Sequence, residues 1–583
     1  MGALFVVRTS DPGFAASALA GARDQFARHG LAAPAERAVP GWRVLHAPHV
    51  LGGPETFLEQ GEDFVAVAGT LTCDGRIGRP ALAALLSMDL SHGPDWARLG
   101  GQFAALVHRR GRTFLFTDYF AAFQLFRDDD ARLFSTSFLA AAGALPTLSF
   151  DAQAVYEMAF NVVPIGDDTV FNELKLLGPE AMVELGRDAA HVHPLAKPLP
   201  DAPVETAESG RIEAHRDRLS AVVQAHSEPF GDRICCPLSG GLDSRLVLAA
   251  LRAAGRKPNV YVYGRPGSED VDIALRIGAS QGFEVEWVDK GAFRRLLPDA
   301  FPEQVERNFQ DYDGLPVYGE IFESGANAAA RDARHPGGAL SASGGCGEIY
   351  RNFFYLPDRP APAAAIARTF FARYDRRDLT EAFGEAGFLR AVEDKILAAL
   401  GRPGDRGALP RPLIEQIYPR VRCRSFFGRE ISLEGRHGPY LMPFLDHRVV
   451  AEAMTLPMRM KHAGRFEAKL LAAIDPDLAR LPSAYGHHFA EPPGARHLFS
   501  EWSSRIRPAW LRQKSYALQR RLRRAAPQRS GYLADDFLGR VIDLDFPAMR
   551  RFFRIGNVAD DGMLMRIANL EYLAARLGSR VRG

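Results

Sequence analysis

The 583-residue chain lacks most of the features that mark secreted, membrane-spanning and nucleic-acid-binding proteins. Its 5 cysteines are scattered and none has CxxC spacing, so neither a disulfide framework nor a zinc site is expected. No run approaches the roughly 20 apolar residues of a membrane helix, and the N-terminus has no basic leader. The formal net charge of +2 gives no overall attraction for nucleic acid. We therefore expect a cytoplasmic protein with neither a membrane nor a nucleic-acid partner.

The first 145 residues are rich in short apolar or alternating runs separated by Gly and Asp clusters, which predict strands. The predicted strands are Ala3–Val7, Phe64–Leu71, Gln102–His108, Thr113–Thr117 and Arg132–Ser135. The segment Ala15–His29 has helical spacing, with Leu19, Ala22 and Phe26 on one face. We expect layered sheets with a few helices in this part of the chain.

From about residue 212 the pattern changes to alternating strands and helices, which predicts a parallel sheet. The predicted elements are strand Arg233–Leu238, helix Ser244–Ala254, strand Asn259–Tyr263, helix Asp270–Gln281 and strand Phe283–Val288. Beyond about residue 300 the pattern is mainly helical. The segment 187–210 is rich in Pro, Ala and Asp and is typical of a linker. We therefore expect domains at 1–190 and 211–583, joined by a linker at 191–210.

The most informative segment is Leu238-Ser239-Gly240-Gly241-Leu242-Asp243-Ser244, in which a buried strand passes directly into a helix. Two glycines let backbone N–H groups turn toward an anion, and the helix N-terminus adds partial positive charge. Ser239 and Ser244 supply hydroxyls, and Asp243 beside a polyanion suggests Mg²⁺ between them. This role needs loop amides that no other protein atom already occupies. The alternative is a tight turn with an Asp or Ser cap.

This string resembles the pyrophosphatase loop of the asparagine synthetase family. Tyr263 stands where the family places a backbone position against adenine, and Ser343 and Gly344 begin a variant of its glycine loop. The family's Pro-Phe-Leu-Asp segment is matched at 443–446, and Lys469 falls where the family carries a Lys. The resemblance implies ATP and Mg²⁺ as cofactors, with Leu238, Ser239, Gly240, Gly241, Asp243, Ser244, Tyr263, Ser343 and Gly344 holding the nucleotide.

The N-terminal residues resemble the family's class II glutamine amidotransferase domain, with Gly101-Gln102-Phe103-Ala104, Asp118 and Phe134-Ser135-Thr136-Ser137 carrying the likeness. The implied fold is an Ntn-type αββα sandwich, an α+β arrangement. It is followed by a parallel-sheet α/β ATP-pyrophosphatase domain with a helical C-terminal part. Such amidotransferases use an N-terminal Cys as nucleophile. Residue 2 here is Gly, and Gly69-Thr70-Leu71 lacks the family's glutamine-binding side chains. We expect a domain that does not hydrolyse glutamine.

The second half also departs from the family. Its acidic pair after the glycine loop is reduced to Glu348, which we assign as a catalytic residue and, with Asp243, as a Mg²⁺ ligand. A helix N-terminal Glu stabilised by the macrodipole is the alternative. The family's late-loop Lys is replaced by Ala484. Lys469, Arg465 or Lys461 could supply the missing charge, and we assign Lys469.

Together these residues predict an ATP-dependent ligase that activates a carboxylate as an acyl-adenylate and joins it to an amine. Relatives with a silent N-terminal domain include the β-lactam synthetases and the lasso-peptide cyclases. The resemblance therefore implies intramolecular amide formation on a peptide or amino-acid-derived substrate, as in a lasso-peptide macrolactam cyclase. A biosynthetic partner protein is a further expectation. Two alternatives are an ammonia-dependent asparagine synthetase and a non-catalytic nucleotide-binding scaffold.

Two basic segments have two interpretations each. The arginines at 420, 422, 424 and 429 could clamp a pyrophosphate or carboxylate, or form interdomain ion pairs. Residues 503–529 hold nine Lys and Arg and no acid. This stretch is either a basic surface helix or a docking site for an acidic peptide or partner.

Overall fold

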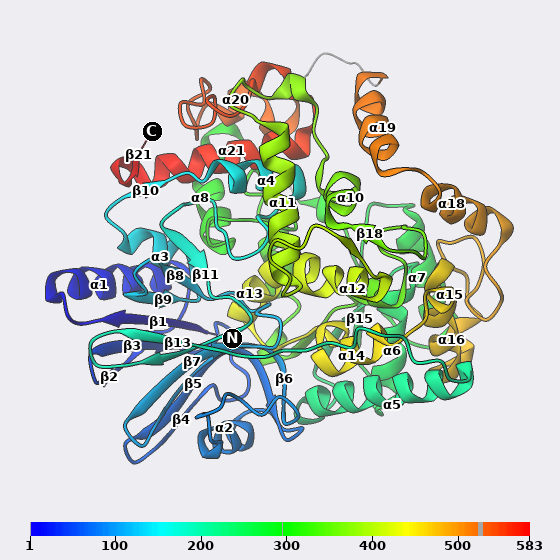
Figure 1. The fold of residues 1–583 in the computed structure, drawn as a ribbon, viewed down its shortest axis with the longest axis horizontal. Coiled ribbons are helices and arrows are strands. Elements are labelled where there is room, and N and C mark those ends of the chain that lie inside the picture. Colours follow the sequence, from blue (N-terminus) through cyan, green and yellow to red (C-terminus); the bar gives the residue numbers. More distant parts are fainter. Residues whose placement is uncertain (1, 294, 523–528, 583) are drawn as a thin grey trace.

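The computed structural model describes residues 2–293, 295–522 and 529–582, whose path is shown in Figure 1. The N-terminal part contains two six-stranded antiparallel sheets. The first has the order β11-β8-β9-β1-β3-β2 and comprises β1 (Ala3–Arg8), β2 (Ala35–Val39), β3 (Trp42–Ala47), β8 (Phe126–Asp128), β9 (Leu133–Ser135) and β11 (Leu174–Leu176). The second has the order β13-β12-β7-β6-β5-β4 and comprises β4 (Phe57–Gln60), β5 (Asp63–Cys73), β6 (Leu99–Arg109), β7 (Arg112–Thr117), β12 (Ala181–Leu185) and β13 (Ala190–Pro194).

Helices cover the outer faces of the two sheets, α1 (Pro12–Arg28) on the first and α2 (Arg79–Ser87) on the second (Figure 1). Because each sheet is covered on both faces, its central strands are apolar along their whole length rather than alternating. Leu4, Phe5 and Val6 of β1 are all fully buried. The predicted layered arrangement is confirmed for this part of the chain, and each predicted strand is present.

The second half is built on a five-stranded parallel sheet of order β16-β15-β14-β17-β20. Its strands are β14 (Ile234–Pro237), β15 (Asn259–Tyr263), β16 (Val285–Val288), β17 (Leu340–Ala342) and β20 (Tyr440–Leu441). The chain runs outward from β14 to β15 and β16, then returns to place β17 on the other side of β14. In open α/β sheets such a reversal creates a crevice at the carboxyl ends of the strands, where ligands bind.

Most remaining residues are helical or irregular, as expected. The helices up to the return strand are α3 (Phe138–Ala144), α4 (Ala152–Asn161), α5 (Glu208–Ser227), α6 (Leu242–Ala253), α7 (Glu269–Gln281), α8 (Phe301–Asp311) and α9 (Ala326–Asp332). Those that follow are α10 (Ala363–Ile366), α11 (Glu385–Ala399), α12 (Arg411–Glu415), α13 (Gly428–His437), α14 (His447–Met454), α15 (Met458–Lys461), α16 (Arg465–Ile474), α17 (Pro476–Ala479), α18 (Ala495–Arg505), α19 (Ala509–Leu522), α20 (Asp535–Leu538) and α21 (Asp561–Leu577). Two short pairs complete the strands: β10 (Leu148–Ser149) with β21 (Val581–Arg582), and β18 (Ala361–Pro362) with β19 (Ala408–Leu409). No helix among the described residues has the length and apolar character to cross a bilayer.

The segment expected as a linker is partly structured. β13 extends to Pro194 and pairs with β12, and α5 begins at Glu208. Between them, Lys197 is buried and its ammonium group donates to the Asp118 carbonyl oxygen at 2.8 Å. Its ammonium also lies 4.3 Å from the centre of the Trp96 ring. The Pro-rich stretch is thus packed against the N-terminal sheets because its one lysine has both a hydrogen-bond acceptor and an aromatic face there.

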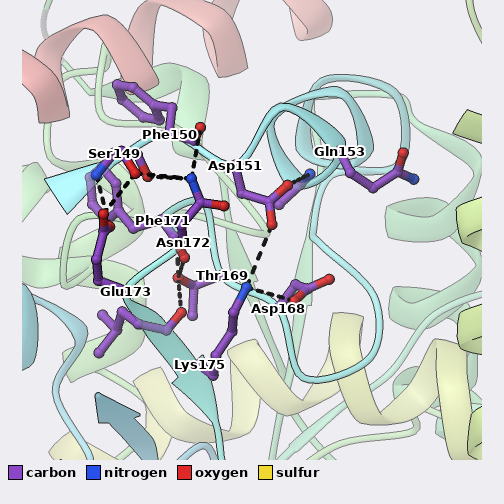
Figure 2. A network of polar contacts seen from close by, with 12 residues as sticks. Ser149, Phe150, Asp151, Gln153, Asp168, Thr169, Phe171, Asn172, Glu173 and Lys175 are labelled. Carbon is purple, nitrogen blue, oxygen red and sulfur yellow. Dashed lines mark hydrogen bonds and ion pairs between the residues drawn. The ribbon is translucent and has the colours of Figure 1, made fainter. Parts of the chain in front are cut away.

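A polar network fixes the connection between the first sheet and α4 (Figure 2). Lys175, in β11, bonds to Asp168 at 2.8 Å and lies 3.5 Å from Asp151, the N-cap of α4. The carboxylate of Glu173 accepts from the backbone N–H and the hydroxyl of Ser149. These bonds hold the loop after α4 against the edge of the sheet, so that α4 can pack on the C-terminal helices.

Asp313 joins the two halves through buried hydrogen bonds. Its carboxylate accepts from the Ser137 hydroxyl and the Phe138 N–H, both at 2.7 Å, and therefore caps α3 from a distant part of the chain. His29 and Arg429 lie 3.5 and 3.6 Å from it. Burial alone would raise the pKa of Asp313, but its contacts with His29, Arg429 and the N–H of Leu139 lower it overall.

We expect Asp313→Ala to lower the free energy of unfolding by about 3 kcal/mol, because it leaves buried donors of α3 without their acceptor and Arg429 without its nearest carboxylate charge. Urea denaturation measures the change. The matched control is Asp24→Ala, at an exposed position on α1, which should cost less than about 0.5 kcal/mol. A loss for Asp313→Ala as small as that of the control would contradict the capping role.

Candidate functional site

The turn between β14 and α6 lies at the carboxyl edge of the parallel sheet, but its amides are not open. The N–H of Ser239 donates to the Ser244 hydroxyl at 3.0 Å, and that of Gly241 donates to the Ser239 hydroxyl at 3.2 Å. The N–H of Gly240 donates to the carboxylate of Asp270 at 2.8 Å. The expectation of unoccupied loop amides is therefore wrong for this arrangement of the chain. All three acceptors are side-chain oxygens.

Asp270 is the charged member of this set. It lies in the first turn of α7 and is exposed to solvent. Its carboxylate therefore occupies a position where backbone N–H groups attract an anion. The turn binds one negative group already, and that group comes from the protein itself.

Three carboxylates surround one guanidinium beside the turn. Arg351 bonds to both carboxylate oxygens of Asp243, at 2.5 and 2.6 Å. It also lies 3.3 Å from Glu467 and 3.8 Å from Glu348. Glu467 is fully buried, and burial followed by the nearby charge of Asp243 holds the pKa of its carboxyl well above the usual range.

The predicted Mg²⁺ ligands, Asp243 and Glu348, do lie near each other, but their arrangement does not fit a metal ion. The guanidinium of Arg351 fills the space on which their carboxylates converge. Within the described residues, no group of three or more His, Cys, Asp and Glu side chains is placed to hold a metal. Arg351 thus supplies the positive charge that Mg²⁺ was expected to supply.

The glycine loop after β17 packs directly on the start of α6. A Cβ at Gly344 would lie 2.8 Å from the Ser244 nitrogen, and one at Gly347 would lie 2.2 Å from the Asp243 carboxylate. Ser343 accepts from the Gly345 N–H at 3.1 Å. Side chains are excluded where the two loops touch, so this sequence-predicted pair of loops does come together.

The late loop also reaches the turn, without a cation of its own. The N–H of Ala484 donates to the Gly240 carbonyl oxygen at 3.1 Å. The next residue, Tyr485, accepts from Arg351 through its hydroxyl at 3.2 Å. Arg351 therefore places a positive charge beside the loop in which Ala484 replaces the family's Lys.

The candidate cations proposed from sequence lie elsewhere. Lys469 has a side chain 52% exposed and pairs with Glu208 of α5. Lys461 is buried and pairs with Glu415 at 3.2 Å, and Arg465 is exposed. None of the three lines a cavity at the turn. The catalytic role of Lys469 stays a prediction.

Two cavities flank the turn. The first, of about 320 Å³, lies at the carboxyl ends of β14, β15 and β17 and is lined by Pro237, Tyr261, Tyr263, Ser343, Glu430 and Tyr440. The second, of about 580 Å³, is lined by Leu242, Glu348, Arg351, Phe353, Tyr485 and Arg512 among others. Pro237 and Leu242 stand at either end of the turn, so a ligand in each cavity would lie next to it.

Sequence reasoning missed Arg351, Glu467 and Asp270. Arg351 follows Glu348 by three residues, a spacing that favours contact within one turn of helix and could have pointed to it. The contacts of Glu467 and Asp270 join segments far apart in the sequence, so no local pattern marks them.

In the described N-terminal residues there is no space for the nucleophilic cysteine or the glutamine substrate of an amidotransferase. Gly2 has φ of +57°, and a Cβ there would lie 2.0 Å from the Ala47 carbonyl oxygen. The cavity beside Gly69, Thr70 and Leu71 measures about 20 Å³, which is close to the space of one water molecule. Neither a cysteine side chain at residue 2 nor a glutamine in this cavity fits the described structure.

The arginine-rich segment serves packing between the halves. Arg424 pairs with Asp167, and Arg429 donates to the side-chain oxygen of Gln124 at 3.2 Å, so each reaches a residue of the N-terminal part. Arg429 also donates to the carbonyl oxygens of Tyr312 and Leu315 in its own half. This supports the interpretation as interdomain contacts, because these guanidiniums are buried and bonded to protein atoms.

No protein-family model matches the chain, and no curated protein is significantly similar to it. Among solved structures, the glutamine phosphoribosylpyrophosphate amidotransferase from B. subtilis complexed with ADP and GMP is 10% identical, with a TM-score of 0.23 over 49% of this chain and 66% of its own. A structure described as the allosteric regulatory enzyme of purine biosynthesis is 11% identical, with a TM-score of 0.23 over 50% of this chain and 80% of its own. A glutamine-dependent NAD+ synthetase from Acinetobacter baumannii in complex with adenosine diphosphate is 17% identical, with a TM-score of 0.16 over 33% of this chain and 40% of its own. The match spans just under two thirds of the first chain and less than half of the third. Since these TM-scores are low, the function below is proposed from the chain's own residues.

Glu430 gives the first cavity a pH-dependent charge. Its carboxylate accepts from the Tyr440 hydroxyl at 3.1 Å. Burial, and secondly the charge of Glu434, raise the pKa of Glu430 from 4.5 to about 7. Because the folded state holds this proton more tightly than the unfolded state, its contribution to stability falls as pH rises from 4.5 to about 7.

We expect Glu430→Gln to remove this loss. The free energy of unfolding of Glu430→Gln minus that of the parent should be larger at roughly pH 8 than at roughly pH 5, by about 1–2 kcal/mol. Urea denaturation at the two pH values measures the difference. Glu62→Gln, at an exposed turn, is the control and should follow the parent at both. A pH-independent difference for Glu430→Gln would rule out titration of this group.

Proposed function

We propose that the protein is an ATP-dependent ligase that forms an amide bond through an acyl-adenylate. The observation that carries the proposal is the position of the turn 238–241 at the reversal of strand order in a parallel sheet, between two cavities. This is the place where open α/β sheets bind ligands. The resemblance of this turn to the asparagine synthetase loop supports a nucleotide as the ligand.

In this proposal the nucleotide base and ribose occupy the first cavity, beside Tyr261, Tyr263 and Ser343. Its phosphates reach the turn, where the hydroxyls of Ser239 and Ser244, 2.9 Å apart, are placed to donate to them. The N-terminus of α6 adds its partial positive charge. The phosphates would displace the carboxylate of Asp270 from the Gly240 N–H, since both are anions competing for one donor.

The carboxylate substrate lies in the second cavity, on the other side of the turn. One of its oxygens attacks the α-phosphorus, and pyrophosphate leaves with the bonding electron pair. Arg351 is a permanent cation at this position, so it stabilises the charge that develops on the phosphate oxygens. An amine then attacks the acyl carbon, and AMP leaves. Glu348 lines the cavity and is assigned to accept the proton that the amine loses.

The size of the second cavity supports a larger substrate than aspartate. About 580 Å³ lined by Phe353, Tyr485 and other aromatic residues suits a peptide segment with apolar side chains. The absence of room for a glutaminase nucleophile supports an amine on the substrate itself. Both features favour macrolactam closure on a peptide over ammonia-dependent asparagine synthesis.

The occupied loop amides favour a second candidate, a nucleotide-binding scaffold without catalysis. In that case Asp270 would exclude phosphates from the reactive position, and Arg351 would remain paired with Asp243. The two candidates differ in whether AMP and pyrophosphate are formed.

For the ligase, we expect substrate-dependent exchange of pyrophosphate into ATP, and no glutamate release from glutamine. Arg351→Ala should lower the exchange rate about 100-fold or more, because it removes the positive charge next to the phosphates. Asp243→Asn should lower the rate by a similar factor, because it removes the carboxylate that holds the guanidinium of Arg351 beside the turn. Lys469→Ala, measured beside them, decides between Arg351 and Lys469 as the stabilising cation. Exchange that survives Arg351→Ala but is lost in Lys469→Ala would reverse our assignment. ATP binding with no exchange in any substrate mixture would support the scaffold.

We expect Asp270→Ala to tighten ATP binding about tenfold, since it frees the Gly240 N–H and removes a competing negative charge. Isothermal titration calorimetry measures the dissociation constant. Asp272→Ala, in the same first turn of α7, is the control for loss of charge alone. If Asp270→Ala weakens ATP binding, its carboxylate holds the turn in shape and does not compete with phosphate.

A further inference from the structure

The second cavity carries an excess of positive charge that the proposed chemistry does not use. Arg368 and Arg507 line it, are exposed, and have no carboxylate partner among the described residues. Arg373 likewise has no carboxylate partner there, and its guanidinium lies 5.0 Å from the centre of the Phe370 ring. Arginine in this state retains its full capacity for bidentate bonds to a carboxylate.

The acidic residues lining the same cavity are already engaged. Glu348 accepts from the Tyr418 hydroxyl, Glu491 pairs with His488 at 3.1 Å, and Glu501 accepts from the Ala463 N–H. The unpaired arginines are therefore not neutralised from within the cavity. A ligand with carboxylates would complete their bonding.

The helices α18 and α19 extend this basic surface outward from the cavity. Arg507 and Arg512 line the cavity from the α18–α19 region, and Lys514 follows on α19. Large apolar side chains are exposed on the same two helices, including Phe499 of α18 at 66% and Trp510 of α19 at 56%. Figure 1 shows both helices at the periphery of the molecule, away from the sheets. Arg523 and Arg524 of the same basic stretch lie outside the described residues.

We propose that the cavity and the surface of α18 and α19 bind an acidic peptide in which carboxylate side chains alternate with apolar ones. This inference rests on the proposed function, because the peptide would be the substrate whose carboxylate the turn activates. The arginines match its carboxylates, and the exposed aromatic rings match its apolar side chains. One end of the peptide enters the cavity, where Arg368 and Arg373 hold a carboxylate beside the one to be activated.

The test is equilibrium binding of a fluorescein-labelled peptide in which Asp and Glu alternate with Phe and Leu, followed by fluorescence anisotropy. A matched peptide carries Asn and Gln in place of the acids. We expect the acidic peptide to bind about tenfold or more tightly than the neutral one, and the double variant Arg368→Glu with Arg373→Glu to lose about tenfold or more of that affinity. The control is Arg28→Glu, an exposed arginine of α1, a helix that Figure 1 shows on the opposite side of the molecule from α18 and α19.

Equal binding of the two peptides, or no loss in the double variant, overturns the proposal, as does tighter binding of a single-stranded oligonucleotide or of anionic vesicles. If the double variant fails to fold, the comparison of the two peptides on the parent protein still decides. ATP binding is measured in parallel by calorimetry. Peptide binding without any ATP-dependent pyrophosphate exchange would contradict the proposed ligase activity and support the peptide site. Exchange without peptide binding would support the ligase and contradict the peptide site.

Discussion

The contact between the glycine loop and the start of α6 is the constraint on which the arrangement of the site depends. Gly344 and Gly347 approach the backbone and side chain of residues 243 and 244 so closely that no Cβ can be accommodated. This contact brings the ends of β14 and β17 together across the reversal of strand order. As a result Asp243, at the start of α6, and Arg351, just beyond the glycine loop, come within hydrogen-bond distance.

The same proximity places the guanidinium of Arg351 among three carboxylates. Asp243, Glu348 and Glu467 would repel one another without a central cation, and Arg351 provides it. Since removing one member of a partly buried ion cluster leaves the others uncompensated, the cluster is stable only as a set. The same set holds the guanidinium of Arg351 beside the turn, where it lines the larger cavity. The residue that keeps this cluster together is thus also the one to which the proposed reaction assigns the stabilising charge.

The elements that could be predicted from the sequence were those whose signal is local. Long apolar runs such as Ala3–Val7 gave correct strands, and the sharp passage from strand to helix at Ser239-Gly240-Gly241 identified the turn. The bonding state of that turn could not be predicted in full, because the N–H of Gly240 donates to Asp270 from another helix. Lys469 shows the same limit: its position in the sequence fitted a family pattern, but it faces Glu208 on the outside of α16.

The second N-terminal sheet packs against the edge of the parallel sheet. β20 is the last strand of the parallel sheet, and the N–H of Tyr440 in it donates to the Thr70 hydroxyl of β5 at 2.9 Å. An uncovered strand at the margin of a sheet can pair with a strand of another molecule and begin aggregation. The N-terminal sheet therefore covers an edge of the parallel sheet that could otherwise pair with a strand of another molecule.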